Sequence, residues 1–154
     1  MMTQQAFATS RFGEIKFTKE DVVNFANGLL GFPKAQQFVL IQHKEGSPFR
    51  WLQSLEDQEL AFLVVDPAEY VTNYAPDMPN SMAESLNLSE ETPRLVYTIV
   101  TIPRGKPKDL TLNLAGPIVI NAESGQAMQT VLDNDEYEIR FRVFPEESPD
   151  HQAA

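Results

Sequence analysis

The most regularly patterned stretch of the sequence is "NLAGPIVINAESGQAMQTVLDNDEYEIRFRV", Asn113–Val143. From Tyr137 to its end, apolar residues alternate with charged ones. This period of two predicts a strand with one buried and one wet face, as antiparallel sheets have. Upstream, Gly116 and Pro117 separate two short apolar runs, and Pro117 should stand at a strand start or edge because it has no N–H to donate. The stretch therefore predicts strand, break, strand, turn and a long final strand.

The break itself predicts a backbone corner. Gly116 should relieve the steric limit on the backbone dihedral angles, and Pro117 should block further strand pairing. Asn113 and Asn121 carry short amide side chains that can hold loop N–H groups by hydrogen bonds. A segment that is regularly patterned but contains no nucleophile or general base suits a protein that acts by presenting a binding surface.

The rest of the chain repeats these signals. "RLVYTIVTI", Arg94–Ile102, is β-branched and nearly all apolar, which predicts a central strand. Turn signals such as Asn27-Gly28 separate further short strands. Short strands with turns between them indicate a bent sheet, a small barrel or a sandwich. The other segments that we expect to be strands are Ile15–Phe17, Gln37–His43, Leu60–Asp66 and Leu110–Leu114.

One segment predicts a helix. In "PNSMAESLNLSEETP", Met82 and Leu86 stand at helical spacing. Ser81, followed by Glu84 at the third position after it, resembles a capping box. We therefore expect one short helix over Ser81–Leu88, docked on the sheet.

Length, charge and composition limit the kinds of protein that this chain can be. The 154 residues fit one domain. A formal net charge of -10 opposes direct binding to nucleic acid or to an anionic membrane, and it favours a basic partner. Acidity that only keeps the protein soluble is the simpler interpretation. The chain has no cysteine, no signal peptide and no apolar run near ~18 residues, so we expect a soluble, cytoplasmic protein without disulfides.

The sequence lacks the motifs of catalysis and of cofactor binding. Its histidines are His43, at the end of a predicted strand, and His151, near the C-terminus, so a hydrolase triad has no credible base. "DNDEYE", Asp133–Glu138, is acidic but lacks the spacing of a calcium loop. No phosphate-binding glycine loop occurs. We therefore expect no enzyme activity, metal or cofactor, with a small-ligand-binding β-barrel as the alternative function.

The aromatic residues of the segment Ser47–Pro67 leave two interpretations open. Phe49 and Trp51 share one face of a predicted strand. Such residues most often fill a core. They can also form an exposed anchor for another protein, because aromatic side chains are enriched at interfaces.

Six segments together resemble the FliW family of flagellar assembly factors. They follow one another in the family's order and span about nine-tenths of the chain. They are "FGEIKF" (Phe12–Phe17), "FANGLLGF" (Phe25–Phe32), "PFRWLQSLEDQELAFLVVDP" (Pro48–Pro67), "IVTIP" (Ile99–Pro103), "LTLNLAGPIVIN" (Leu110–Asn121) and "QTVLDNDEYEIR" (Gln129–Arg140).

The resemblance implies a regulator without enzymatic activity. It implies an all-β fold: a small, strongly bent, antiparallel β-barrel-like domain with one short helix over residues 1–144, followed by a flexible acidic tail at 145–154. It also implies two mutually exclusive partners. One is flagellin, and the other is CsrA, an RNA-binding repressor of flagellin mRNA translation. The resemblance implies no direct contact with nucleic acid or membrane, and no small-molecule substrate.

The residues that we expect at the partner-binding surface come from the family-like segments. The sequence does not divide them between the two partners. They are Phe32, Trp51, Asp66, Pro67, Asn113, Pro117, Ile118, Asn121, Gln129, Asp133, Asp135 and Glu136.

Overall fold

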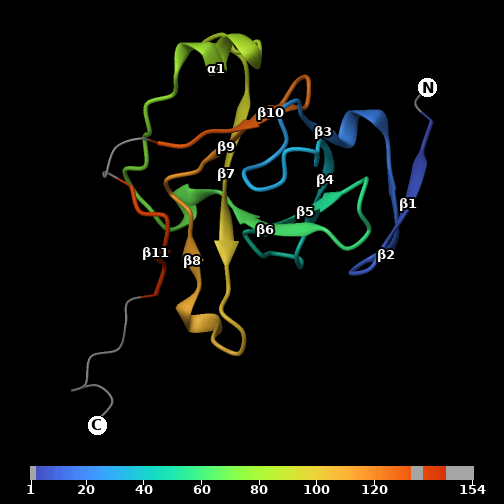
Figure 1. Cartoon of the computed structure of the whole chain (residues 1–154), viewed down its shortest axis with the longest axis horizontal. Helices are drawn as coiled ribbons and strands as arrows, with labels where there is room; N and C mark the ends of the chain where they lie inside the picture. The colour runs from blue at the N-terminus through green and yellow to red at the C-terminus, as the bar shows by residue number, and fades with distance from the viewer. Residues whose placement is uncertain (1–2, 133–136, 145–154) are drawn as a thin grey trace.

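The computed structural model describes residues 3–132 and 137–144. The described part is mostly β, with one short α-helix, as expected (Figure 1). Its strands are β1 Gln5–Thr9, β2 Gly13–Phe17, β3 Val22–Phe25, β4 Gln37–Gln42, β5 Phe49–Ser54, β6 Ala61–Val65, β7 Arg94–Thr101, β8 Thr111–Leu112, β9 Ile118–Asn121, β10 Gln126–Gln129 and β11 Phe141–Arg142. Its helical segments are the 3₁₀ helices η1 Lys19–Asp21, η2 Pro67–Glu69 and η3 Pro107–Asp109, and α1 Asn80–Ser85. The expected tail at 145–154 lies outside the described residues.

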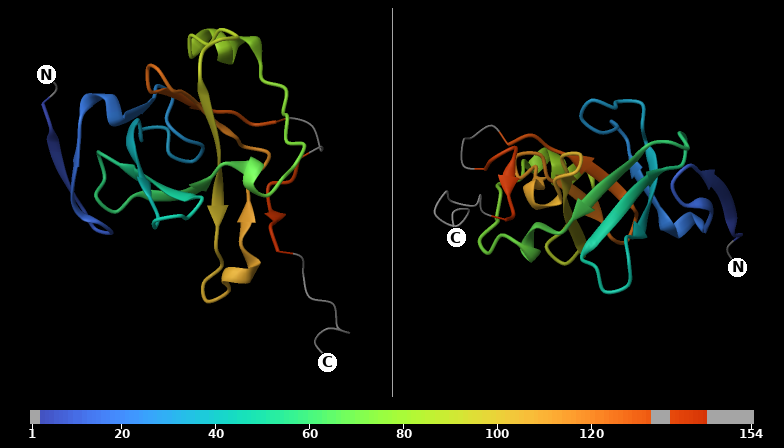
Figure 2. Two further views of the ribbon diagram at one scale, coloured as in Figure 1. Left: turned by 180° about the vertical axis from the view of Figure 1, so that it is seen from behind. Right: turned by 90° about the horizontal axis from the view of Figure 1, so that it is seen from below.

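Most strands form one strongly bent sheet. Its order is β11-β8-β7-β6-β5-β4-β3-β10-β9, and β7 also pairs with β9. This extra pairing closes the strands from β3 to β7, with β9 and β10, into a barrel (Figures 1 and 2). The pairings are antiparallel, except that β10 runs parallel to β3. The hairpin of β1 and β2 lies at one side of the barrel, and α1 lies over the end at which β7 begins.

Strand β7 is central, as its β-branched composition predicted. It pairs with β9 over Arg94–Tyr97, with β6 over Thr98–Ile99 and with β8 over Val100–Thr101. Because its partners change along its length, the sheet bends at this strand. The prediction of a central strand at Arg94–Ile102 is confirmed.

Apolar side chains fill the barrel interior. Phe25, Phe38, Leu52 and Ile118 are each no more than 1% exposed. The rings of Phe25 and Phe38 meet edge to face, with centroids 5.5 Å apart. Burying a side chain of this size contributes about 1.5–3 kcal/mol to the free energy of unfolding. The packed interior fixes the strands whose loops form the surfaces described below.

The helix was correctly expected, but its start differs from the prediction. Its N-cap residue is Pro79, whose side chain has no group that accepts a hydrogen bond, so the proposed capping box of Ser81 and Glu84 is wrong. Met82 and Leu86 are buried and pack on Val119 of β9, as the spacing predicted. A helix anchored by these two residues needs no polar cap. No helix in the described part of the chain is long and apolar enough to cross a membrane.

The final strand is shorter than its alternating sequence predicted. Only Phe141–Arg142 pairs, because β8, its partner, is itself two residues long. Tyr137 and Phe141 pack against the core, but Ile139 is 67% exposed in a turn. A strand over the whole of 137–143 is therefore wrong.

Candidate partner-binding surface

The predicted corner at Asn113–Pro117 is present, and side-chain amides hold it. The Ala115 N–H donates to Asn113 Oδ1 at 3.2 Å. The reason for the glycine differs from the prediction, because Gly116 does not have a positive φ. Instead, a Cβ at Gly116 would lie 2.8 Å from Asn113 Nδ2 and 3.2 Å from Gln129 Nε2. The absence of a Cβ at Gly116 thus lets two amide side chains approach the backbone.

A tyrosine pair supports the corner from the side of β11. The Tyr74 hydroxyl donates to the Leu114 carbonyl at 2.6 Å, and its ring meets that of Tyr137 at a centroid distance of 4.7 Å. Burial raises the pKa of the Tyr74 hydroxyl above its ordinary value, and Tyr137 adds to the shift. The raised pKa keeps the hydroxyl protonated, and therefore a donor, to a higher pH than that of an ordinary tyrosine.

A tight turn stands next to the corner, in "GLLGF". The N–H and C=O groups of Leu29 and Phe32 bond to each other at 3.1 and 2.7 Å. Leu29 is 2% exposed and anchors the turn in the barrel core. Gly28 and Gly31 both have a positive φ, of 67° and 83°, which other residues rarely adopt. We call this segment the Leu29–Phe32 turn.

Gln129 connects the corner to the Leu29–Phe32 turn. Its Nε2 donates to the Gly116 carbonyl at 3.0 Å, and its Oε1 accepts from the Leu30 N–H at 2.9 Å. Gln129 lies in β10, opposite Ile118 of β9, so its backbone is fixed by the barrel. The single amide therefore holds two loops together and restricts the conformations of the turn.

The turn presents apolar side chains to solvent. Leu30 is 52% exposed and Phe32 is 42% exposed, and the Phe32 ring rests edge-on against Phe62, with centroids 5.2 Å apart. Exposed large apolar side chains on a rigid loop are a feature of interaction surfaces. This arrangement is why we take the turn as the candidate partner-binding surface.

Two hollows flank the turn. The first has a volume of about 320 Å³ and is lined by Phe32 and Leu60, with the charged residues Lys34, Glu56 and Asp57. The Glu56 carboxylate accepts from the backbone N–H groups of Gln36 and Gln37 at 2.8 and 2.9 Å, so its charge is held in place. The second hollow, of about 300 Å³, lies on the other side of the turn and is lined by Leu29, Leu30, Met128 and Gln129, among others. The surface thus combines apolar anchors with charged groups, of which the Glu56 carboxylate is held in place.

The structure brings together part of the expected set. Phe32, Gln129, Asn113 and Pro117 belong to the turn and the corner that supports it. Ile118 is 1% exposed beside them and belongs to the barrel core. Buried members such as Pro117 and Ile118 can affect a partner only through the shape of the surface above them.

The other expected residues lie elsewhere. Trp51 is half-buried beneath the β1–β2 hairpin, with the Arg11 guanidinium 4.1 Å from its ring centroid. Asp66 caps η2 by accepting from the Ala68 N–H, and Pro67 is buried there. Asn121 is buried at the far end of β9. Asp133, Asp135 and Glu136 lie outside the described residues.

The sequence prediction did not include Leu30, although it lies within the family-like segment Phe25–Phe32. The sequence places two adjacent leucines between glycines, and in this turn Leu29 is buried whereas Leu30 is exposed. Among the described residues, no group of three or more His, Asp or Glu side chains is placed to hold a metal ion.

Comparison with known proteins identifies the family. The family model described as "FliW protein" matches residues 6–143. The chain is 41% identical over 138 residues to the flagellar assembly factor FliW of Desulfitobacterium hafniense (strain DSM 10664 / DCB-2), covering 90% of each protein. It is 37% identical over 145 residues to that of Moorella thermoacetica, covering 94% of this chain and 92% of that one.

A solved structure agrees with these sequence matches. A chain described as "Crystal structure of the flagellar assembly factor FliW" superposes with a TM-score of 0.85 at 34% identity. The match covers 94% of this chain and 100% of that chain. The chain therefore belongs to the FliW family of flagellar assembly factors.

Proposed function

We propose that this protein regulates flagellar assembly in the cytoplasm by binding two proteins in turn, without catalysing a reaction. Its partners are flagellin and the translational repressor CsrA, and each excludes the other. While flagellin occupies the protein, CsrA is free to repress flagellin mRNA. Once flagellin is exported, the protein captures CsrA and translation resumes. Membership of the FliW family supports the assembly role.

The observation that carries the proposal is the rigid presentation of Leu30 and Phe32. Immobilising a flexible loop on binding opposes association, and a loop that is already held avoids much of that loss. The turn is held by its own paired backbone groups, by buried Leu29 and by the amide of Gln129. A surface of this kind serves recognition and offers no chemistry.

The net charge suits the proposed partners. A chain of formal charge -10 attracts a basic RNA-binding protein and repels its RNA. Charge of this kind raises the association rate more than it slows dissociation. The protein can therefore bind the repressor without itself binding the mRNA.

The alternative function, a small-ligand-binding barrel, is less well supported. Such a barrel needs a polar cavity within its strands. The interior of this one contains the side chains of Phe25, Phe38, Leu52 and Ile118. The hollows beside the turn lie on the outside of the barrel, where they suit a protein partner better than a small molecule.

A competition experiment tests the function. Size-exclusion chromatography with light scattering should detect a complex with CsrA, and a second complex with flagellin. Adding flagellin to the preformed CsrA complex should release CsrA as free repressor. A ternary complex that persists at saturating flagellin contradicts the exclusive switch, and failure to bind either protein contradicts the function as a whole.

A second prediction concerns the surface. The double substitution Leu30→Ser with Phe32→Ser should weaken binding of at least one partner by about tenfold, or about 1.4 kcal/mol, because it removes the exposed apolar anchors. Isothermal titration calorimetry measures the loss. Ile102→Ser is the matched control, since Ile102 is 46% exposed after β7 and away from the turn. Wild-type affinity of the double variant for both partners would exclude the turn as a docking site.

A further inference from the structure

A basic segment connects β7 to β8 at one end of the molecule (Figure 1). We call this segment, Pro103–Asp109, the basic loop. It contains Arg104, Lys106 and Lys108, all of them exposed. These are three of the 12 lysines and arginines in a chain whose formal net charge is -10. In the described part of the chain, none of the three forms an ion pair, so the loop is a local concentration of positive charge on an acidic protein.

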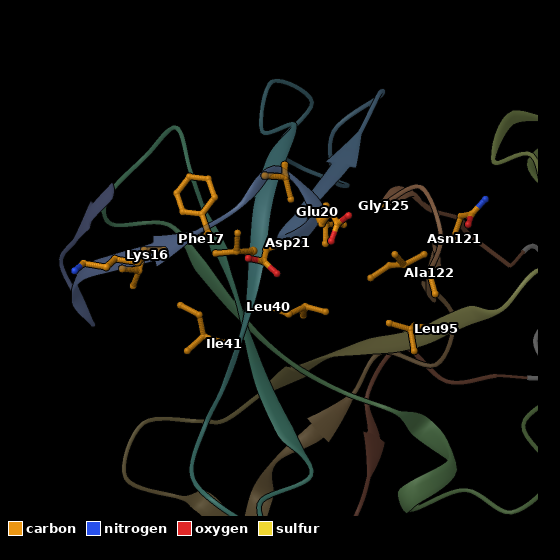
Figure 3. Close-up of a pocket in the computed structure, with 15 residues that line it drawn as sticks. Lys16, Phe17, Glu20, Asp21, Leu40, Ile41, Leu95, Asn121, Ala122 and Gly125 are labelled. Atoms are coloured by element: carbon orange, nitrogen blue, oxygen red, sulfur yellow. The ribbon is translucent and has the colours of Figure 1, made fainter. Parts of the chain in front are cut away.

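A second charged region of the surface, by contrast, carries both signs. It is a hollow of about 460 Å³ between the barrel and the segment of β2 and η1 (Figure 3). The charged residues that line it are Lys16, Glu20 and Asp21, so an acidic ligand would meet two carboxylates there. The basic loop has a single acid, Asp109, and its Oδ1 pairs with Nη2 of Arg142 at 2.9 Å. The loop is therefore better suited than the hollow to attract an acidic segment.

The backbone of the basic loop is held by consecutive turns. The Lys106 N–H donates to the Pro103 carbonyl at 3.0 Å, and the Asp109 N–H donates to the Lys106 carbonyl at 2.9 Å. A third bond, from the Leu110 N–H to the Pro107 carbonyl at 3.4 Å, closes η3. Because the loop backbone is held before anything binds, less conformational freedom is lost on binding.

Strand β11 leads the chain toward this loop. It pairs antiparallel with β8, with Phe141 opposite Leu112 and Arg142 opposite Thr111. Since β8 begins just after η3, β11 runs back toward the end of the molecule at which η3 lies (Figures 1 and 2). The ion pair of Arg142 with Asp109 joins β11 to the loop at this point. The chain therefore leaves β11 beside the basic loop.

The sequence that follows Phe144 is acidic. Residues 145–154 contain Glu146, Glu147 and Asp150, and no lysine or arginine. Asp150 follows Phe144 by six residues, so even a fully extended chain places it within about 22 Å of Phe144. So short a tether gives an effective concentration on the order of millimolar, which a separate acidic segment would have to match. The tether thus favours these three acids over other acidic occupants of the loop.

We propose that residues 145–154 bind to the basic loop of the same molecule, through ion pairs of Glu146, Glu147 and Asp150 with the three cations of the loop. Exposed ion pairs are individually weak, so the acids act as a group and no single pair dominates. The contact screens the cations of the loop from other anions, such as a nucleic acid backbone. This inference goes beyond the proposed function and does not depend on it, since it concerns the chain by itself.

Paramagnetic relaxation enhancement in the full ¹⁵N-labelled chain tests this contact. The chain has no cysteine, so Ala153→Cys provides a single attachment site for a nitroxide spin label. A matched variant carries the same label together with Glu146→Gln, Glu147→Gln and Asp150→Asn. Both tails have the same tether, so a difference between them reports charge alone. The enhancement at the amides of the basic loop should be at least about twofold larger with the acidic tail, and the difference should vanish near 1 M salt, where the Debye length is about 3 Å.

Charge reversal in the loop completes the test. Lys106→Glu with Lys108→Glu should reduce the enhancement to the level of the neutral tail. Lys16→Glu with Lys19→Glu is the matched control, because it makes the same change of charge in β2 and η1, away from β11 (Figure 1). This control should leave the enhancement unchanged. All four lysines are exposed, and equal melting temperatures of the two variants show that the fold is intact.

Three outcomes would each overturn the proposal. Equal enhancement by the acidic and the neutral tail at low salt would mean that the tether alone brings the tail near the loop. Enhancement that arises only in a mixture of ¹⁵N-labelled chains with separate spin-labelled chains would assign the loop to the tail of a second copy. Displacement of the tail by an equimolar single-stranded oligonucleotide would assign the loop to a phosphate backbone. Neither flagellin nor CsrA is present in these measurements, so such a failure leaves the proposed function standing.

Discussion

Replacing Gly28 with alanine is expected to lower the melting temperature by roughly 4–20 °C, because each kcal/mol lost corresponds to about 2–4 °C in a domain of this size. Gly28 has a φ of 67°, where a residue with a Cβ is strained by about 1–2 kcal/mol. The added Cβ would lie 2.5 Å from the carbonyl oxygens of Phe32 and Pro33. These are backbone atoms, so no side-chain rotation relieves the overlap, and such overpacking costs about 1–3 kcal/mol more.

Gly31→Ala is the matched control for this prediction. Gly31 has a φ of 83°, but nothing lies within 4 Å of the position that its Cβ would take. This variant should therefore show the backbone strain alone, about 1–2 kcal/mol. Differential scanning calorimetry of both variants separates the two effects. Equal losses in the two variants would show that the Leu29–Phe32 turn moves aside at Gly28 without difficulty.

Loss of the turn geometry should also affect binding. Gly28→Ala displaces the segment that carries Leu30 and Phe32, whereas Gly31→Ala leaves its anchor at Leu29 in place. At a temperature where both variants are folded, Gly28→Ala should bind the partners of the turn more weakly than Gly31→Ala. This comparison separates the shape of the turn from the stability of the whole domain.

The strands that the sequence predicted well are those whose own residues decide their burial. Arg94–Ile102 is so rich in β-branched residues that it had to lie within a sheet, and β7 has partners along both edges. The alternation in 137–143 was less informative. It shows which side chains could share a face, but not whether a partner strand exists to pair with them. β8 is only two residues long, because η3 precedes it and the corner follows soon after. Only two residues of the final segment can therefore pair with it.

For the helix, too, the sequence pattern predicted burial better than it predicted where the element begins. The apolar spacing of Met82 and Leu86 located it, because that spacing reports burial directly. The Ser81 and Glu84 motif misplaced the cap. Local hydrogen bonds at the end of a short helix contribute less than its docking on Val119, so the tertiary contact decides where the helix begins.

The candidate surface could be predicted only in part. The family-like segments contain Phe32, Asn113 and Gln129, but nothing in their spacing says that Gln129 reaches Leu30, which lies 99 residues earlier. That contact depends on the parallel pairing of β10 with β3, which places the start of the turn beside β10. A single sequence contains no measure of such long-range pairing. Gly116 is a similar case, because two side chains use the space left by its missing Cβ, whereas its own φ is one that other residues can adopt.

The second large loss of stability is expected when Asn121 is substituted. Its side chain was predicted to hold loop N–H groups by hydrogen bonds, and it does so. Its Oδ1 accepts from the N–H groups of Glu123 and Ser124 at 2.9 and 3.2 Å. Its Nδ2 donates to the Leu86 carbonyl at 2.7 Å, at the C-terminal end of α1. With only 3% of the residue exposed, this side chain joins the helix to the β9–β10 turn away from water.

Asn121→Ala is expected to lower the free energy of unfolding by roughly 2–4 kcal/mol, measured by urea denaturation. A buried polar group left without a partner costs about 1–3 kcal/mol, and the Leu86 carbonyl is such a group. The two N–H groups belong to exposed residues and can bind water, so they add less. Asn24→Ala is the matched control, because Asn24 is exposed and its loss should stay within about 0.5 kcal/mol.

A further variant, Asn121→Asp, separates the two sides of this side chain. The acceptor oxygens toward Glu123 and Ser124 are kept, but a carboxylate oxygen replaces the donor that faces the Leu86 carbonyl. The two N–H groups favour the charged form of the new carboxyl, whereas burial and the Leu86 carbonyl disfavour it. Because only 3% of the residue is exposed, we expect the second effect to be larger and the pKa of this carboxyl to be raised in the folded protein. A raised pKa means that stability, relative to wild type, is greatest below the unfolded-state pKa and falls as the pH rises through the folded-state pKa. Denaturation at acid and at neutral pH should therefore show the larger loss at neutral pH. A loss that does not change with pH would mean that the Leu86 carbonyl finds another donor, and that Asn121 acts only on the β9–β10 turn.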